Sequence, residues 1–74
     1  MAHDYSKLLG RIVEKCGTQR VFSDKIGLSE RTVSLKLNDK LPFKQSEIES
    51  IMAVLDIPIT EIAEYFFRAE VQNF

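Results

Sequence analysis

The sequence predicts an all-α protein in which five helices pack around one core. Apolar residues recur at steps of three and four over several segments, which is the spacing of amphipathic helices. One segment, from Gln19 to Asn38, carries two such short stretches with Gly27 between them. A chain of 74 residues has room for one domain, which we expect to span 1–74 with short mobile tails, no strands and no internal repeat.

The first helix is expected to begin near Tyr5 and to end at Gly17. Its predicted apolar stripe consists of Leu8, Leu9, Ile12, Val13 and Cys16. Cys16 is the only cysteine, so it cannot form an internal disulfide, and we expect a buried structural thiol. The only histidine, His3, falls in the expected mobile N-terminal tail and is given no function.

The second and third helices are expected to share a core across a tight turn. Thr18 is the predicted N-cap of a helix from Gln19 to Ile26, and Gly27 enters positive φ without a Cβ penalty. The third helix is expected from about Ser29 to Leu37, with Ser29 as its cap and residues 38–40 as its exit turn. The predicted shared core consists of Phe22, Ile26, Leu28, Val33 and Leu37, with Ser23 as the small residue where the helices approach.

Two further helices are predicted after a linker at residues 41–43. The fourth begins between Lys44 and Ser46, where Ser46 and Glu49 have the spacing of a capping box, and Pro58 stops its extension. Its inward residues are predicted to be Ile48, Ile51, Met52 and Leu55. The last helix is expected to start near Ile59 or Thr60 and to bury Ile62, Tyr65 and Phe66, leaving 69–74 as a tail.

Charge is divided unevenly along the chain, although the formal net charge is only −1. Residues 15–44 have a local balance of +4, and residues from 45 onward have a balance of −5. The basic residues of the first of these segments are Lys15, Arg20, Lys25, Arg31, Lys36, Lys40 and Lys44. This division indicates a molecule with one side that faces DNA.

Several function classes are disfavoured by the sequence. The longest apolar run, residues 51–55, is too short to cross a bilayer, and the N-terminus has no signal segment, so we expect a cytoplasmic location. One cysteine and one histidine cannot form a metal cluster within one chain, and no glycine-rich phosphate loop is present. We therefore expect no enzyme activity, no metal and no cofactor.

The segment from Gln19 to Asn38 resembles the helix-turn-helix of the Cro and phage-repressor superfamily. The matching residues are Gln19, Gly27, Val33 and the pair Leu37 and Asn38. Ser23 departs from the more usual alanine, and Lys36 stands where a core aliphatic residue is often found. With its closing EYFF segment, the chain is similar to small Cro-like regulators and repressor modulators of temperate phages and prophages.

This resemblance implies a compact lambda-repressor-like DNA-binding domain that regulates transcription at an operator, usually as a symmetric dimer. In this motif the third helix, residues 29–37, would lie in the major groove. The predicted base contacts are Ser29, Glu30, Arg31, Ser34 and Leu35. Arg31 can pair with guanine and Glu30 can accept from a cytosine amino group. The structural alternative is that Glu30 only complements the helix dipole and Arg31 is a solvated charge.

Phosphate contacts are predicted at two places on the same motif. Thr18 and Gln19 lie at the start of the second helix, whose N–H groups point at a phosphate in this motif. Around the far end of the third helix the predicted contacts are Lys36, Asn38, Lys40 and Lys44. Each of these four also fits a solubilising surface residue.

The C-terminal segment contains more aromatic residues than one helix face can bury. Because adjacent residues on a helix cannot all face one core, at least one ring is expected to be left over. Phe67 and Phe74 are the predicted protein interface, with a second copy of the chain or a cognate phage repressor as partner. The alternative is that Phe67 covers the linker near Phe43.

Two functions follow from these predictions. The first is sequence-specific binding of a double-stranded operator by a Cro-type regulator, as a homodimer at least on DNA. The second is modulation of a phage repressor through protein–protein contact, with weak DNA affinity of the chain itself. The basic segment and Arg31 favour the first, and the near-neutral net charge and spare aromatic rings favour the second.

Overall fold

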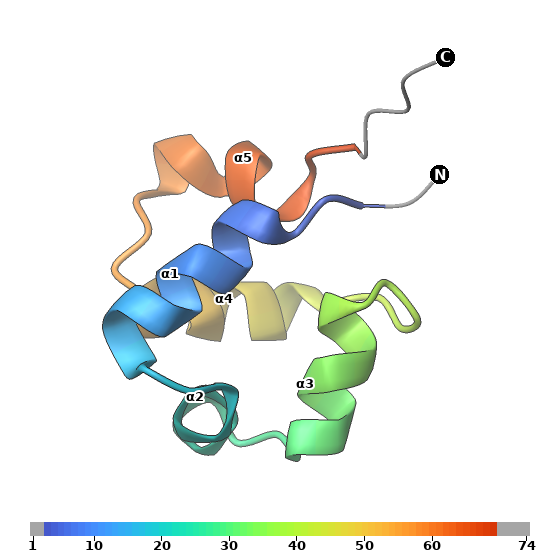
Figure 1. The fold of residues 1–74 in the computed structure, drawn as a ribbon. Coiled ribbons are helices and arrows are strands. Elements are labelled where there is room, and N and C mark those ends of the chain that lie inside the picture. Colours follow the sequence, from blue (N-terminus) through green and yellow to red (C-terminus); the bar gives the residue numbers. More distant parts are fainter. Residues whose placement is uncertain (1–2, 70–74) are drawn as a thin grey trace.

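Five α-helices and one short 3-10 helix, η1, make up the computed structural model, which describes residues 3–69 (Figure 1). Their bounds are α1 Ser6–Cys16, α2 Gln19–Ile26, α3 Glu30–Leu37, α4 Gln45–Val54, η1 Ile59–Glu61 and α5 Ile62–Phe66. Residues 3–69 contain no strand, only an isolated antiparallel bridge between His3 and Ala69. The predicted all-α class with five helices is therefore confirmed.

Every α-helix contributes side chains to one core. The buried apolar residues are Tyr5, Leu8, Ile12, Phe22, Val33, Leu37, Ile51, Leu55, Ile57, Tyr65 and Phe66. α2 lies centrally because it contacts α1, α3 and α4. Its Phe22 is fully buried, and Ser23 beside it is buried with its hydroxyl donating to the carbonyl of Arg20 at 2.8 Å. The predicted small residue is thus buried in the core.

The apolar stripe predicted for α1 is wrong at two positions. Leu8 and Ile12 are buried, whereas Leu9 is exposed and Val13 has 64% of its surface exposed. Adjacent helical residues point about 100° apart, so a helix that buries residues four apart turns their neighbours towards solvent. Cys16 packs against the core but is only partly buried, so the expectation of a buried thiol holds in part.

The predicted caps of α2 and α3 are confirmed. The Thr18 hydroxyl accepts the N–H of Val21 at 3.2 Å, and the Ser29 hydroxyl accepts the N–H of Thr32 at 3.1 Å. Gly27 ends α2 with a φ of 74°, in the left-handed region that glycine enters without strain. The turn between α2 and α3 is therefore fixed by local chemistry.

The capping box predicted for α4 at Ser46 and Glu49 is wrong. α4 begins at Gln45, and the carboxylate of Glu47 accepts the backbone N–H of Lys44 at 2.8 Å. The same carboxylate also forms an ion pair with Lys36. The helix start thus has a local cap at Lys44 and Glu47, to which α3 adds a tertiary contact.

The N-terminal segment contacts the rest of the chain at His3, whereas the mobility of the tails stays a prediction. The backbone N–H of His3 donates to Asp39 at 2.8 Å, and its ring nitrogen lies 2.9 Å from the other carboxylate oxygen. The His3 ring stacks on Tyr5 with 5.5 Å between centroids. The N–H of Asp4 donates to the carbonyl of Arg68 at 2.8 Å, so both described ends of the chain lie side by side (Figure 1).

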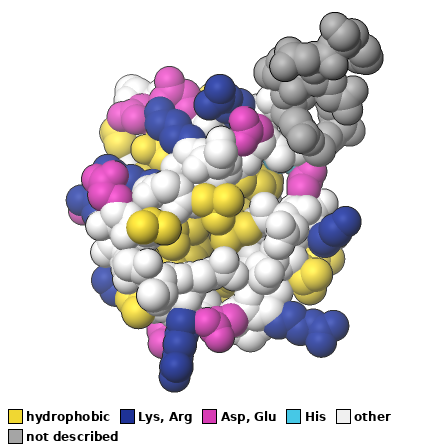
Figure 2. Space-filling view, in the orientation of Figure 1, with side chains coloured by type: hydrophobic (Ala, Val, Ile, Leu, Met, Phe, Trp, Pro, Cys, Tyr) yellow, Lys and Arg dark blue, Asp and Glu magenta, His cyan; other side chains and the backbone are white. Residues whose placement is uncertain are grey.

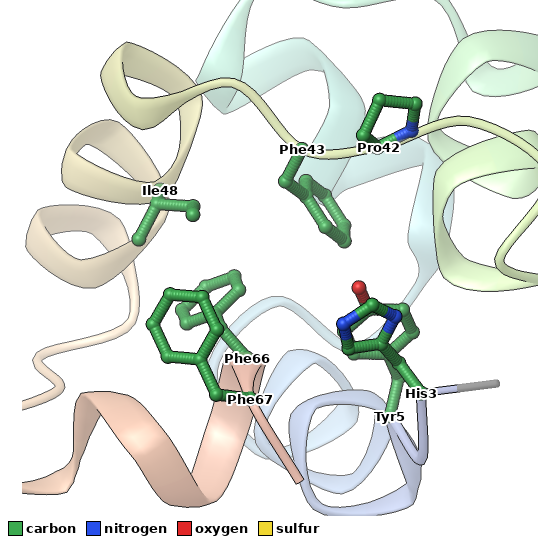
Figure 3. Close-up of a pocket in the computed structure, with 7 residues that line it drawn as sticks. All are labelled: His3, Tyr5, Pro42, Phe43, Ile48, Phe66 and Phe67. Carbon is green, nitrogen blue, oxygen red and sulfur yellow. The ribbon is translucent and has the colours of Figure 1, made fainter. Parts of the chain in front are cut away.

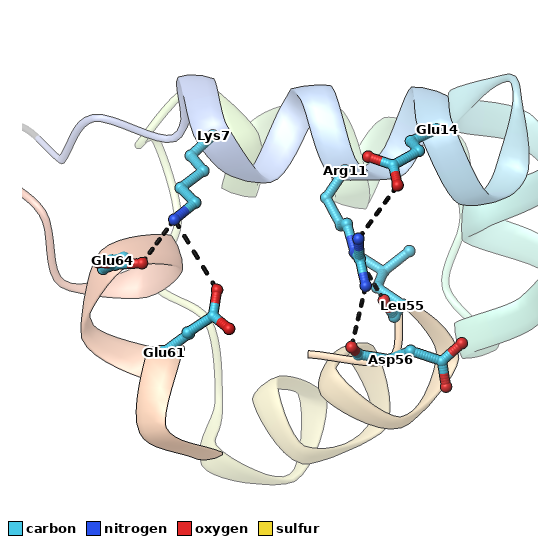
Figure 4. A network of polar contacts seen from close by, with 7 residues as sticks. All are labelled: Lys7, Arg11, Glu14, Leu55, Asp56, Glu61 and Glu64. Carbon is cyan, nitrogen blue, oxygen red and sulfur yellow. Dashed lines mark hydrogen bonds and ion pairs between the residues drawn. The ribbon is translucent and has the colours of Figure 1, made fainter. Parts of the chain in front are cut away.

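Two basic residues of α1 connect it to the C-terminal half (Figure 4). Lys7 pairs with Glu64 of α5 and lies 3.9 Å from Glu61. Arg11 donates to the carbonyls of Leu55 and Asp56 at 2.8 and 3.0 Å. These bonds hold α5 and the turn after α4 against α1. None of the described helices is long and apolar enough to cross a membrane.

The conformation of Gly27 gives a stability prediction. We expect Gly27→Ala to lower the free energy of unfolding by about 1–2 kcal/mol, because an L-residue is strained at positive φ. Gly10→Ala is the matched control: Gly10 lies within α1 with open space at its Cβ position, and alanine there should stabilise by about 0.5–1 kcal/mol. Urea unfolding measures both, and equal effects of the two substitutions would contradict the prediction.

Candidate functional site

The surface of α3 is the candidate site that the sequence predicts. Its first turn carries Glu30 and Arg31, and both side chains are exposed. Within residues 3–69 neither forms an ion pair, and no described segment covers them. The pair is therefore accessible to a macromolecular partner.

The other predicted base contacts are less available. The hydroxyl of Ser29, besides capping α3, donates to the hydroxyl of Thr32 at 2.9 Å. Ser34 and Leu35 are only partly exposed. The side-chain amide of Asn38 donates to the Ser34 carbonyl at 2.8 Å and lies 3.4 Å from its hydroxyl. The polar side chains of Ser29 and Asn38 thus form hydrogen bonds within the protein.

Of the predicted phosphate contacts, Lys40 and Lys44 are exposed and form no ion pair within residues 3–69. Thr18 is exposed, but its hydroxyl caps α2, and Gln19 is partly buried. Asn38 is exposed, with its amide donating to Ser34. Of the predicted phosphate contacts, Lys40 and Lys44 are therefore the two exposed basic residues that form no ion pair within residues 3–69.

The prediction that Lys36 contacts a DNA phosphate does not agree with the position of this residue in the structure. Only 5% of this residue is exposed, and its ammonium group pairs with the carboxylate of Glu47. Lys36 lies three residues after the buried Val33 and therefore shares its helix face. It cannot reach a phosphate without leaving the core. The signal in the sequence was its position, where the resembled family has a core aliphatic residue.

Lys36 and Glu47 form a buried ion pair in which Lys36 stabilises the charged form of the Glu47 carboxylate. Burial raises the pKa of Glu47, but the hydrogen bond from Lys36, the backbone N–H of Lys44 and the charges of both lysines outweigh it. The pKa of Glu47 consequently lies below its usual value. The Glu47 carboxylate therefore stays charged near neutral pH, and its contact with Lys36 joins the end of α3 to the start of α4.

The predicted leftover ring is Phe67, which has 59% of its surface exposed. Phe74, its predicted partner in a protein interface, lies outside the described residues. Phe67 borders a hollow of about 210 Å³ that Phe43 also lines, so the ring lies near the linker and yet remains exposed (Figure 3). Phe67 can therefore lie against the linker near Phe43 and still be available for a protein interface.

The floor of this hollow is aromatic. Phe43 packs edge to face against Tyr5 and against Phe66, with centroid distances of 5.4 and 5.6 Å. Figure 3 shows Phe66 and Phe67 next to Ile48 of α4, with His3 and Tyr5 on the other side of the opening. Such rings are well suited to contacts with another protein, because each offers a large apolar area at a low cost in conformational entropy.

Charges of both signs lie around the face formed by α1, α2 and α3. Figure 2 shows apolar side chains near the middle of this face, with lysines or arginines and acidic residues around its edge. Proteins that bind DNA through phosphates usually present a coherent basic surface.

Among residues 3–69, no cluster of three His, Cys, Asp or Glu side chains is arranged to hold a metal ion.

A family model described as "Protein of unknown function (DUF739)" matches residues 1–69 of the chain. The chain belongs to this family. The DUF739 description states no function and names no helix-turn-helix class, so the resemblance to the Cro superfamily stays a prediction. No curated protein matches the chain.

A solved structure of a regulatory protein is similar to this DUF739 chain over almost its whole length. It is the solution structure of the modulator of repression of the temperate bacteriophage TP901-1 from Lactococcus lactis. The two sequences are 56% identical, 97% of each chain is covered, and the TM-score is 0.81. The similarity thus extends over both α3 and the aromatic hollow.

The buried pair gives a mutational prediction. We expect Lys36→Met to lower the free energy of unfolding by about 3 kcal/mol, because it leaves the Glu47 carboxylate without its partner. Adding Glu47→Gln to this variant should restore most of the loss, since glutamine is neutral and can still accept the N–H of Lys44. Urea unfolding of both variants checks this, and a single variant as stable as the wild type would contradict it.

The same pair gives a pH prediction. The pKa of Glu47 is lower in the folded protein than in the unfolded chain, so its stabilisation is complete above about pH 4.5 and is lost as the pH falls through the folded pKa. Between pH 7 and pH 3 the wild type should therefore lose more stability than Glu47→Gln. Identical pH profiles of the two proteins in urea unfolding would show that Glu47 contributes no such linkage.

Proposed function

We propose that the chain modulates a phage repressor by binding that repressor directly. The observation that carries this proposal is the 56% identity, over 97% of both chains, to a protein named as a modulator of repression. A similarity of this extent supports a shared mode of action as well as a shared fold. In this proposal the chain acts in the cytoplasm, on the repressor, and changes the access of that repressor to DNA.

The state of α3 supports protein binding over strong DNA binding. Ser29 and Asn38 use their side chains to cap or close the helix, and Lys36 is buried with Glu47. Each phosphate contact that is lost reduces the electrostatic part of DNA affinity, which supplies most of non-specific binding. We therefore infer that the DNA affinity of the chain itself is weak.

A second candidate function is operator binding of the Cro type, as a homodimer on DNA. The observation that favours it is the exposure of Glu30 and Arg31 on the first turn of α3, where a recognition helix contacts bases. Lys40 and Lys44 would then be the phosphate contacts that remain. This function requires the chain to bind operator DNA without another protein.

Two binding measurements separate these functions. Titration calorimetry with the purified repressor encoded beside the gene should show direct binding, and a gel shift should show that the chain changes the mobility of the repressor–operator complex. At low ionic strength the chain alone should not shift the DNA upstream of its gene. A shift by the chain alone that Arg31→Ala removes would contradict the proposal and support the Cro-type function.

A further inference from the structure

A second and larger hollow adjoins the aromatic one. Its volume is about 480 Å³, and its lining residues come from the linker before α4, from α4 itself and from the η1–α5 segment. They are Phe43, Gln45, Ile48, Glu49, Met52, Ile59, Ile62 and Phe67. Because Phe43, Ile48 and Phe67 line both hollows, the two adjoin each other, and we call them together the α4–α5 groove.

The groove exists because α4 and α5 are held by different parts of the molecule. α4 packs on α2, whereas α5 packs on α1, where Lys7 pairs with Glu64. The turn between them is anchored by the buried Ile57 and by the bonds from Arg11 to the carbonyls of Leu55 and Asp56 (Figure 4). The outer apolar residues of α4 and α5 are therefore left facing a space that no described side chain fills.

Two large apolar side chains on this groove are exposed to water. Ile59 has 70% of its surface exposed and Phe67 has 59%. Ile48, Met52 and Ile62 are partly buried, and they pack against the core at the same place. A hollow with large apolar residues exposed on it is typical of a protein-binding surface.

The charge of the groove indicates the chemistry of its partner. Four acidic residues of the C-terminal half have basic partners: Glu47 pairs with Lys36, Asp56 with Lys15, and Glu61 and Glu64 with Lys7. Glu49, by contrast, is exposed on the groove and has no ion pair within residues 3–69. A partner with a lysine or arginine beside its apolar residues would complement this carboxylate.

We propose that the α4–α5 groove binds an amphipathic helix of the phage repressor, with its apolar face in the groove and a lysine or arginine on Glu49. A helix fits because an apolar groove between helices accepts anchors spaced i, i+4 and i+7, and no described strand offers an edge for pairing. This inference rests on the proposed function and assigns its contact surface.

The same carboxylate argues against a second copy of the chain as the occupant. A two-fold symmetric contact uses the same surface on both copies. If the groove residues were at the centre of such a contact, the two Glu49 carboxylates would be brought together without a cation from the groove. The charge pattern therefore favours a different, basic partner.

Three variants test the groove against two matched controls. We expect Phe67→Ser and Ile59→Ser each to weaken repressor binding at least tenfold, because large apolar anchors carry most of the affinity of an interface. Glu49→Lys should weaken it as well, with the largest effect at low salt. Val13→Ser, an exposed apolar site on α1, and Asp24→Lys, an exposed acid on α2, should change the dissociation constant less than twofold.

The readouts are titration calorimetry with the purified repressor, circular dichroism to verify the fold of each variant, and light scattering to measure mass. If the wild type binds and all three groove variants bind equally well, the groove assignment is wrong while the proposed function stands. If the wild type does not bind the repressor, the proposed function fails and the assignment with it. A dimer of the wild type that Phe67→Ser dissociates would assign the groove to a second copy and overturn the inference.

Discussion

The buried ion pair between Lys36 and Glu47 is the constraint on which the rest of the structure depends. It joins the end of α3 to the start of α4, and the same carboxylate caps α4 through the N–H of Lys44. In the intervening loop Asp39 has a φ of 60° and its carboxylate accepts the N–H of His3. The pair also fixes where Phe43 enters the core, because this residue precedes the capped helix start directly.

Two functional consequences follow from this one contact. The first is that α3 gives up a cation which would otherwise face the DNA backbone, so the helix has fewer groups for phosphate binding. The second is that the linker places Phe43 between Tyr5 and Phe66, where it lines both hollows of the α4–α5 groove. The Lys36–Glu47 pair thus makes the α3 surface less suited to binding DNA and helps to form the α4–α5 groove.

Much of the fold could be predicted from the sequence because its signals are local. The caps at Thr18 and Ser29 and the turn at Gly27 depend on a few neighbouring residues, and the structure confirms all three. Lys36 and His3 could not be placed, since their partners Glu47 and Asp39 lie 11 and 36 residues away. The spare ring of Phe67 was predictable from helix geometry, but the groove beside it depends on how α4 and α5 pack on different helices.

The central claim is that the chain meets a repressor with the α4–α5 groove, and the direct test is nuclear magnetic resonance of the labelled chain during titration with unlabelled repressor. Backbone signals of Ile48, Met52, Ile59, Ile62 and Phe67, and methyl signals of the three isoleucines and Met52, should shift or broaden. Backbone signals of Glu30 and Arg31 should change little. The opposite pattern, with changes confined to the first turn of α3, would contradict the account.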